Sequence, residues 1–289
     1  MSRNRGRTDG MQPARPEDTN TPAQHLANNA ENATPFSFVV PTEFVDLPSG
    51  GKHYAPGHPL HGVDSIEIKQ MTAKEEDILT SRTLLKKGVA LDRMIQSVIL
   101  NKSIDPKSLL VGDRNAILVS IRVSGYGNEY STNIACPDCG VNQQYTFDLN
   151  DTNTYVGDDI EELKVFQVAE GVFSTTLPLT GIEVAFKLLD GYDEKRLADG
   201  IEHDRKKRND KVITRQLRTM IISVKEDTSK EVINYLVENI PSMDSRHLRM
   251  AYKAAAPNLD LSQNFECSEC EYDQKIEVPL NADFFWPDR

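Results

Sequence analysis

The chain has 289 residues, long enough for two modest domains or one large one. Its 33 lysine and arginine residues are outnumbered by 44 aspartate and glutamate residues, and the formal net charge of −11 argues against a surface built mainly to bind phosphate backbones. The longest apolar run, at 116–119, falls far short of the roughly 18 residues that span a bilayer. Because no apolar segment follows the N-terminus, we expect no secretory signal peptide and no membrane partner.

The first 35 residues differ in composition from the rest of the chain. Residues 1–35 contain no aromatic side chain, their charges cancel, and Pro, Asn, Thr, Ala and Gln predominate. Such a segment cannot bury enough apolar surface to offset the conformational entropy lost on ordering. We therefore expect a flexible arm that is either disordered or ordered only on a neighbouring subunit.

After the arm, the sequence predicts strand-like segments followed by helices. An extended segment is expected at 36–41, a glycine-containing turn at 48–51 and an alternating strand at 64–71. Thr72 and Glu75 have the spacing of a capping box, in which each side chain satisfies a free backbone N–H at the start of a helix. Helical patterns then cover residues 73–86 and 89–101.

The remainder of the chain alternates between helical and strand-like sections. Asp113 is expected to cap a helix that Gly125 ends, and a β section is expected at 128–149. Further elements are predicted as strands at 161–168, 172–178 and 182–189, helices within 193–256 and strands within 262–281. Helices and short strands in separate runs predict an α+β fold.

Two Cys-x2-Cys pairs carry the clearest chemical signal in the sequence. They are Cys136-Pro137-Asp138-Cys139 and Cys267-Ser268-Glu269-Cys270. Two residues between cysteines let the chain turn tightly, so that both sulfur atoms point at one ion, and two such turns supply the four thiolates of a tetrahedral Zn²⁺ site. We therefore predict one structural Zn²⁺ per chain, held by Cys136, Cys139, Cys267 and Cys270, with no open position for catalysis.

Two other interpretations of the cysteines stay open from the sequence. The 127 residues between Cys139 and Cys267 exceed the usual spacing of a zinc ribbon, so the thiols can instead remain two unligated pairs. A thioredoxin-type redox pair is the third interpretation, although neither cysteine pair begins an obvious helix after a strand.

The surroundings of the two cysteine pairs match at a constant offset of 131 residues. Besides the cysteines, six positions are identical across this offset: Asp113 and Asp244, Ser131 and Ser262, Asn133 and Asn264, Gln143 and Gln274, Leu149 and Leu280, and Asn150 and Asn281. The matches predict an internal repeat of two related halves, 36–150 and 151–289, each ending in strands that flank one cysteine turn. A single shared ion would join the halves as a zinc-ribbon-like pair.

Other groups of polar residues give weaker signals. His53, His58 and His61 lie close in sequence without a framework of carboxylates, and we expect surface histidines there. The basic run Arg205-Lys206-Lys207-Arg208 lies among acidic residues on a helical pattern, which is typical of a solvated helix face or a charged protein contact. The sequence shows no catalytic grouping with a local signature, so we expect no enzymatic activity.

Several stretches of the sequence, taken in order, resemble those of a known family. They are Leu47-Pro48-Ser49-Gly50-Gly51-Lys52-His53-Tyr54, then Met71-Thr72-Ala73-Lys74-Glu75-Glu76-Asp77-Ile78-Leu79, then Leu109-Leu110-Val111-Gly112-Asp113-Arg114-Asn115-Ala116-Ile117-Leu118 with Arg122, Tyr126-Gly127 and Cys136-Pro137-Asp138-Cys139-Gly140. The series is similar to the T4-type bacteriophage baseplate protein family, the baseplate hub subunits of contractile-tailed phages. The resemblance is specific over about residues 40–150, weaker from 150 to 260, and returns at the second cysteine pair and Phe284-Phe285-Trp286.

The resemblance implies a structural subunit of a contractile phage tail baseplate hub, with no catalytic residue to transfer. Its implied partners are other hub and tail proteins, with further copies of itself as a candidate; its implied location is the virion tail baseplate, after assembly in the host bacterial cytoplasm. One alternative is a baseplate assembly factor or chaperone that is not retained in the virion. Another is a cytoplasmic zinc-ribbon adaptor that binds nucleic acid through residues 205–208, which the net charge of −11 disfavours.

Overall fold

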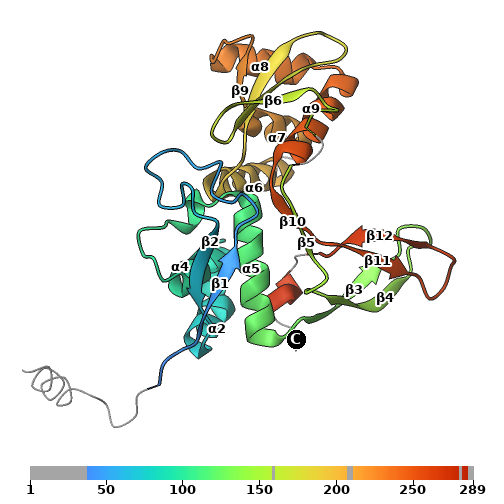
Figure 1. The fold of residues 1–289 in the computed structure, drawn as a ribbon. Helices are drawn as coiled ribbons and strands as arrows, with labels where there is room; N and C mark the ends of the chain where they lie inside the picture. Colours follow the sequence, from blue (N-terminus) through green and yellow to red (C-terminus); the bar gives the residue numbers. More distant parts are fainter. Residues whose placement is uncertain (1–37, 158–159, 207–210, 280–281, 286–289) are drawn as a thin grey trace, which may run out of the picture. The chain divides into compact units, whose positions relative to one another are not determined.

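The computed structural model describes residues 38–157, 160–206, 211–279 and 282–285 (Figure 1). The chain separates into two compact units, Met1–Val40 and Pro41–Arg289. Of the first unit only residues 38–40 are described, and they lie in neither a helix nor a strand, so the arm expected at 1–35 falls outside the described residues. None of the described helices combines the length and the apolar character needed to cross a lipid bilayer.

The second unit begins with a β-hairpin that a group of helices follows. Strands β1 (Thr42–Asp46) and β2 (Ser65–Lys69) pair antiparallel. The loop between them starts with the predicted turn, where Gly51 has a φ of 70° and a Cβ would lie 2.4 Å from the backbone of Val63, so that no other residue fits. The helical elements that follow are α2 (Ala73–Thr80), α3 (Arg82–Lys86), α4 (Ala90–Val98), the 3₁₀ helix η1 (Pro106–Ser108) and α5 (Val111–Tyr126).

Further along the chain, small antiparallel sheets alternate with helices. The strands are β3 (Glu129–Ala135), β4 (Asn142–Asp148), β5 (Asn153–Tyr155), β6 (Val165–Ala169), β7 (Val172–Thr176), β8 (Glu183–Lys187), β9 (Ile221–Val224), β10 (Asn258–Asp260), β11 (Ser262–Glu266) and β12 (Asp273–Glu277). The helices are α6 (Gly191–Lys206), α7 (Val212–Met220), α8 (Lys230–Asn239), α9 (Ser242–Ala255) and the 3₁₀ helix η2 (Ala282–Phe285). Strands β6-β7-β8-β9 form one four-stranded sheet, whereas β1-β2, β3-β4, β5-β10 and β11-β12 are two-stranded.

Helix α5 connects these elements, because it contacts β1, β10, α6 and η2. Its first turn lies against the start of β10, where a Cβ on Gly112 would lie 1.9 Å from the carbonyl oxygen of Pro257, so only glycine permits this approach. Asn115 adds a hydrogen bond of 3.2 Å to the side chain of Asn258. Most of the buried apolar residues described in the second unit form one cluster, which includes Ile117 and Ile121 of α5. The predicted mixture of helices and short strands is confirmed.

The sequence misplaced both ends of α5. The helix begins at Val111 after Leu110, so Asp113 is its third residue and not its N-cap. The Asp113 carboxylate instead accepts hydrogen bonds from the backbone N–H of Ser49 at 2.9 Å and from the hydroxyl groups of Ser49 and Tyr54 at 2.6 and 2.7 Å. At the other end, the helix continues through Gly125 to Tyr126, and the residue that caps it is Gly127, whose φ of 84° suits glycine.

Asp244 makes the same kind of contact in α9. It is the third residue of that helix and is fully buried. Its carboxylate accepts hydrogen bonds from the backbone N–H groups of Leu179 and Thr180 at 2.8 and 3.1 Å, and from the Thr180 hydroxyl at 2.8 Å. Asp113 and Asp244 thus each hold the turn of a hairpin, β1-β2 in one case and β7-β8 in the other.

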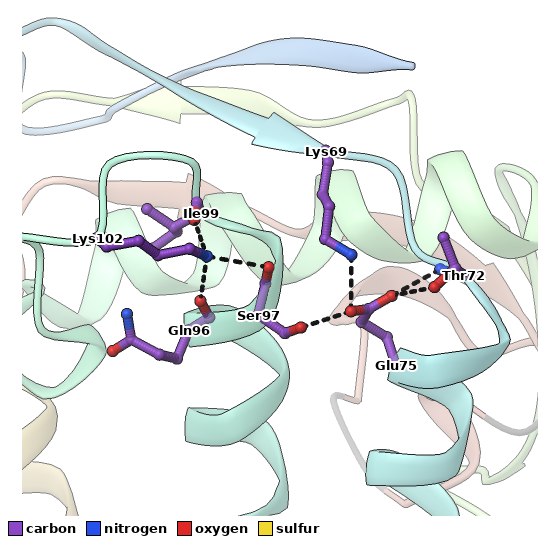
Figure 2. Close-up of polar contacts among 7 residues, drawn as sticks. All are labelled: Lys69, Thr72, Glu75, Gln96, Ser97, Ile99 and Lys102. Atoms are coloured by element: carbon purple, nitrogen blue, oxygen red, sulfur yellow. Dashed lines mark hydrogen bonds and ion pairs between the residues drawn. The ribbon is translucent and has the colours of Figure 1, made fainter. Parts of the chain in front are cut away.

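The predicted capping box at the start of α2 is present, and it belongs to a larger buried network (Figure 2). Glu75 accepts from the backbone N–H of Thr72 at 3.0 Å and pairs with Lys69 at 2.8 Å, and it also accepts from the Ser97 hydroxyl of α4. Figure 2 also shows Lys102 donating to backbone carbonyl groups at the end of α4, those of Gln96, Ser97 and Ile99. The network therefore joins β2, α2 and α4.

A similar network lies at the start of α6. Lys187, at the end of β8, pairs with the buried Asp193 at 2.6 Å. Asp193 accepts from the backbone N–H of Asp190 at 3.4 Å, and Asp190 accepts from the backbone N–H of Asp193 at 2.8 Å. Lys187 and Asp193 are as far apart in sequence as Lys69 and Glu75. The connection from β8 to α6 is therefore held by the same kind of ion pair as the connection from β2 to α2.

Other predicted boundaries differ from the structure. Of the extended segment expected at 36–41, residues 38–41 are described, and they lie in no strand. The first strand begins after them, at Thr42. The helix expected over 73–86 is interrupted at Ser81, whose side chain accepts from the N–H of Leu84 to begin α3. Within 193–256, where only helices were expected, β9 pairs with β8 because its apolar side chains complete the core face of the sheet.

Candidate metal centre

The two cysteine turns each close a β-hairpin, and the hairpins lie side by side (Figure 1). In the first, β3 and β4 pair antiparallel with Ala135 opposite Asn142 next to the turn. In the second, β11 and β12 pair with Glu266 opposite Asp273. Both hairpins therefore place a Cys-x2-Cys sequence at the same end, as the sequence predicted.

Backbone hydrogen bonds shape both turns in the same way. The N–H of Cys136 donates to the carbonyl oxygen of Val141 at 2.9 Å, and the N–H of Cys267 donates to that of Tyr272 at 2.9 Å. In the first turn, the N–H of Gly140 also donates to the carbonyl oxygen of Cys136, and Gly140 has a φ of 72°. Neither cysteine pair begins a helix, which is the position of a thioredoxin-type redox pair.

The turns bring all four sulfur atoms together. The Sγ atoms of Cys136 and Cys270 are 3.7 Å apart, as are those of Cys139 and Cys267, and all four lie within 4.8 Å of one another. Sulfur ligands about 2.3 Å from a tetrahedral Zn²⁺ are separated by about 3.8 Å, close to the spacing seen here. All four cysteines are free thiols. The donor set and its spacing suit a tetrahedral metal ion.

The thiols influence one another's ionisation. Burial favours the neutral thiol of Cys136, but backbone N–H donors of Cys139 and Asp138 favour the thiolate and lower its pKa to about 7. At Cys270 the backbone N–H of Tyr272 favours the thiolate, whereas burial and the three neighbouring thiols raise its pKa to about 12. Four thiolates this close repel one another unless a cation neutralises them, so ionisation of the whole set requires a bound metal ion.

Gln143 of β4 holds the second cysteine turn against the first hairpin. Its Nε2 donates to the carbonyl oxygen of Glu266 at 2.9 Å. Its Oε1 accepts from the backbone N–H of Ser268 at 2.9 Å and from the Ser268 hydroxyl at 3.0 Å. The sequence did not reveal this role, since the identity of Gln143 with Gln274 indicates a repeat and not a hydrogen-bond partner.

Further contacts join the two hairpins below the sulfur atoms. The Tyr145 hydroxyl donates to the carbonyl oxygen of Asn264 at 2.8 Å, and its ring lies 5.1 Å from that of the buried Phe265. At the far end, Gln263 donates to the carbonyl oxygen of Asp148 at 2.6 Å and accepts from its backbone N–H at 3.1 Å. These contacts keep the cysteine turns in register without a shared β-ladder.

Arg122 fixes the base of the first hairpin. Its buried guanidinium donates to three carbonyl oxygens, those of Phe284, Gly127 and Glu129, at 2.7, 2.6 and 2.9 Å. Because the three carbonyls belong to η2, the end of α5 and β3, one side chain joins three segments. Burial lowers the pKa of Arg122 from its usual value.

The histidines at 53, 58 and 61 lie in the loop between β1 and β2. His58 and His53 are half-buried, which differs from the expected surface position. His58 Nε2 lies 2.9 Å from the Ser108 hydroxyl, and His61 Nδ1 lies 2.7 Å from the carbonyl oxygen of Tyr54. Within the described ranges, the four cysteines form the only group of three or more His, Cys, Asp or Glu residues with ligand atoms close enough for a metal ion.

The basic run falls only partly within the described residues. Arg205 and Lys206 end α6 and are exposed, and Lys206 pairs with Glu202 at 2.8 Å. Lys207 and Arg208 lie outside the described residues. The described half of the run therefore has the features of a solvated helix face.

A comparison of the sequence with protein families extends this picture. The sequence model described as T4 bacteriophage base plate protein matches residues 40–286. The chain belongs to this family. Searches with this chain found no matching curated protein and no matching solved structure. The match to the base plate family spans both cysteine turns and the region from 150 to 260, where the motifs of the resemblance are weaker. Membership implies a structural role, a place in the virion tail and contacts with other baseplate proteins.

Proposed function

We propose that this base plate protein is a structural subunit of the hub of a contractile phage tail baseplate and that it catalyses no reaction. The observation that carries the proposal is the family match over residues 40–286. The assignment to the hub rests on the resemblance over about residues 40–150, in stretches such as 47–54 and 71–79. The subunit would act by presenting fixed surfaces to other tail proteins.

We also propose that the four cysteines hold one structural Zn²⁺. Bound to four thiolates, the ion would supply a cross-link and contribute its binding free energy directly to folding. Support comes from the 3.7 Å sulfur separations and from the hydrogen bonds of Gln143 that hold the second turn. Because 127 residues separate Cys139 from Cys267, the ion would fasten the C-terminal hairpin to the middle of the chain.

The internal repeat is part of the same proposal, with 36–150 and 151–289 as its halves. Helices α5 and α9 begin at residues 111 and 242, which are 131 apart, and each places a buried aspartate at its third position. The Lys69–Glu75 and Lys187–Asp193 pairs occupy the same place in β2-α2 and in β8-α6. A duplicated unit clamped by one ion would give the hub a rigid part with two similar surfaces.

A phage that lacks this chain tests the structural role. Without it, infected cells should make heads and tail fibres but few functional baseplates, and supplying the wild-type chain should restore them. Mass spectrometry of purified virions should then detect the chain at a fixed copy number. Normal particles without the chain, together with turnover of a substrate by the purified protein, would refute the proposal.

The same experiment separates a structural subunit from an assembly factor. If baseplates fail without the chain but purified virions do not contain it, the chain acts in assembly and the hub assignment is wrong. A matched pair of complementing variants, Cys267→Ser and Glu269→Gln, tests the zinc component. We expect Glu269→Gln to restore assembly and Cys267→Ser to restore little, since only the first leaves the sulfur cluster intact.

A further inference from the structure

Strand β1 leaves one edge uncovered within the described residues. It pairs with β2 through a regular antiparallel register, and the flanking bonds run from Gln70 N–H to the Pro41 carbonyl and from Leu47 N–H to the Asp64 carbonyl. Backbone groups alternate in direction along an antiparallel strand, so the odd-numbered residues of β1 face β2. Residues 42, 44 and 46 therefore turn their N–H and C=O groups away from β2, and no described backbone group bonds to them.

The corresponding edge in the second half is covered. Strand β7 faces β8 through its odd-numbered residues, as the bond from Leu177 N–H to the Ile182 carbonyl shows, and its even-numbered residues face β6. Ser174, opposite Phe166 of β6, is 7% exposed, whereas Phe44 in the matching place on β1 is 71% exposed. The hairpin β7-β8 thus has a third strand beside it, and the hairpin β1-β2 does not.

Among the described residues, no segment covers the β1 edge as β6 covers the β7 edge. Strand β6 returns to β7 through a two-residue turn that ends in Gly171, with a φ of 66°. Residues 38–41, which precede β1, contain no turn, so the chain does not fold back there. The described residues therefore supply no strand beside β1.

The edge of β1 also lacks the features that usually prevent strand addition. Edge strands are commonly protected by bulges, prolines or lysines. Strand β6 has a register shift between Gln167 and Ala169, and the N–H of Val165 is already bonded to the carbonyl of Ile160. The register of β1 is unbroken, and Pro41 lies on the side that faces β2. Phe44 is exposed on the face of the hairpin opposite the buried Val45.

We propose that two copies of this chain associate through β1, edge to edge and antiparallel about a twofold axis, to form a four-stranded sheet of order β2-β1-β1-β2. A twofold contact requires a self-complementary surface, and an open, regular strand edge has this property. This inference goes beyond the hub assignment and does not depend on it.

The charges of β1 restrict the register of this pairing. If the twofold axis passes through Thr42, Asp46 of one copy lies opposite residue 38 of the other. If the axis passes through Phe44, Asp46 lies opposite Thr42, so neither register places two carboxylates opposite each other. An axis at Glu43 would oppose two glutamates, which destabilises a cross-strand pair. The contact area of a single strand pair is small, so we expect a weak dimer that depends on protein concentration.

Sedimentation velocity of the full chain over a range of concentrations tests the proposal, with Phe44→Pro as the main variant. Because the Phe44 N–H faces away from β2, proline removes a bond to the second copy and none within the hairpin. We expect the wild type to form a dimer and Phe44→Pro to remain a monomer. Gln167→Pro is the matched control, since it places proline at an outward-facing position of β6, and it should dimerise as the wild type does.

Two further measurements keep the test decisive if Phe44→Pro does not fold. Phe44→Lys retains the backbone N–H but adds the charge that protects natural edges, and it should weaken the dimer at least about tenfold. In the wild type, the amides of Phe44 and Asp46 should exchange with deuterium more slowly at high concentration, while that of Val45, which faces β2, should not change. A chain that stays monomeric, a dimer unaffected by Phe44→Lys, or slowing of Phe44 exchange only after other tail proteins are added would overturn the proposal.

Discussion

The side-chain amide of Gln143 is bonded to Ser268 through both the backbone N–H and the hydroxyl, across 125 residues of sequence. A third bond, from Gln143 to the carbonyl of Glu266, makes the amide a clamp on the second cysteine turn. The side chain of Gln274, its match in the proposed repeat, accepts only a 3.4 Å bond from the Tyr272 hydroxyl among the contacts of the described residues, and Gln274 is exposed. The proposed repeat is therefore asymmetric at this pair of positions.

This asymmetry predicts unequal effects of two otherwise identical substitutions. Gln143→Ala removes three hydrogen bonds and should lower the free energy of unfolding by about 1–3 kcal/mol. Gln274→Ala should change it by less than about 0.5 kcal/mol. Urea denaturation of both variants measures the difference, and equal effects would show that the clamp does not stabilise the protein.

The purified protein should contain about one Zn²⁺ per chain, measurable by elemental analysis. Removal of the metal with a chelator should lower the Tm by about 10 °C or more, because a structural ion contributes binding free energy to the folded state. Cys267→Ser should lose the metal and leave the C-terminal hairpin prone to proteolysis, whereas the neighbouring Glu269→Gln should retain it. A metal-free preparation with an unchanged Tm would rule out the zinc assignment.

Glu75 predicts a pH-dependent contribution to stability. Although burial would raise its pKa, hydrogen bonds from Lys69, Ser97 and Thr72 lower it from 4.5 to about 2. A carboxylate with a lowered pKa stabilises the folded state above its unfolded pKa, and this contribution disappears as the pH falls from about 4.5 to about 2. Glu75→Gln should therefore cost about 1–3 kcal/mol at pH 7 and progressively less below pH 4.5.

The control for this variant is Glu76→Gln, an exposed neighbour in the same helical turn. Its effect should stay below about 0.5 kcal/mol at every pH. Chemical denaturation at pH 7, 5, 4 and 3 compares the two. A cost of Glu75→Gln that does not vary over this range would show that the ionised carboxylate is not the stabilising species.

The composition of residues 1–35 predicts that glutamyl endopeptidase cleaves the free subunit first within this segment, after Glu17 and Glu31. Glu43 of β1 and the buried Glu75 should resist cleavage under the same conditions, because their backbone is held in a strand and a helix. Mass spectrometry of the early products identifies the sites. Early cleavage after Glu43, with Glu31 intact, would contradict the expectation of a flexible arm.

The sequence by itself determined the local features of this protein. The capping box of Thr72 and Glu75 and the turn at 48–51 depend on residues a few positions apart, and their chemistry holds wherever they occur. The same is true of the two cysteine turns, where the spacing alone makes both sulfur atoms point the same way. The offset of 131 between the turns also indicated which segments correspond, and so which hairpins would meet.

Only the tertiary structure decided which distant groups the polar side chains would bind. Asp113 has the local character of a helix cap, yet its carboxylate binds Ser49 and Tyr54, because the β1-β2 loop packs on the first turn of α5 and brings these donors to it. The apolar residues of β9 suit a helix or a strand equally, and the uncovered side of β8 determines the strand. Such choices depend on groups that approach one another only after folding, and a local pattern holds no information about them.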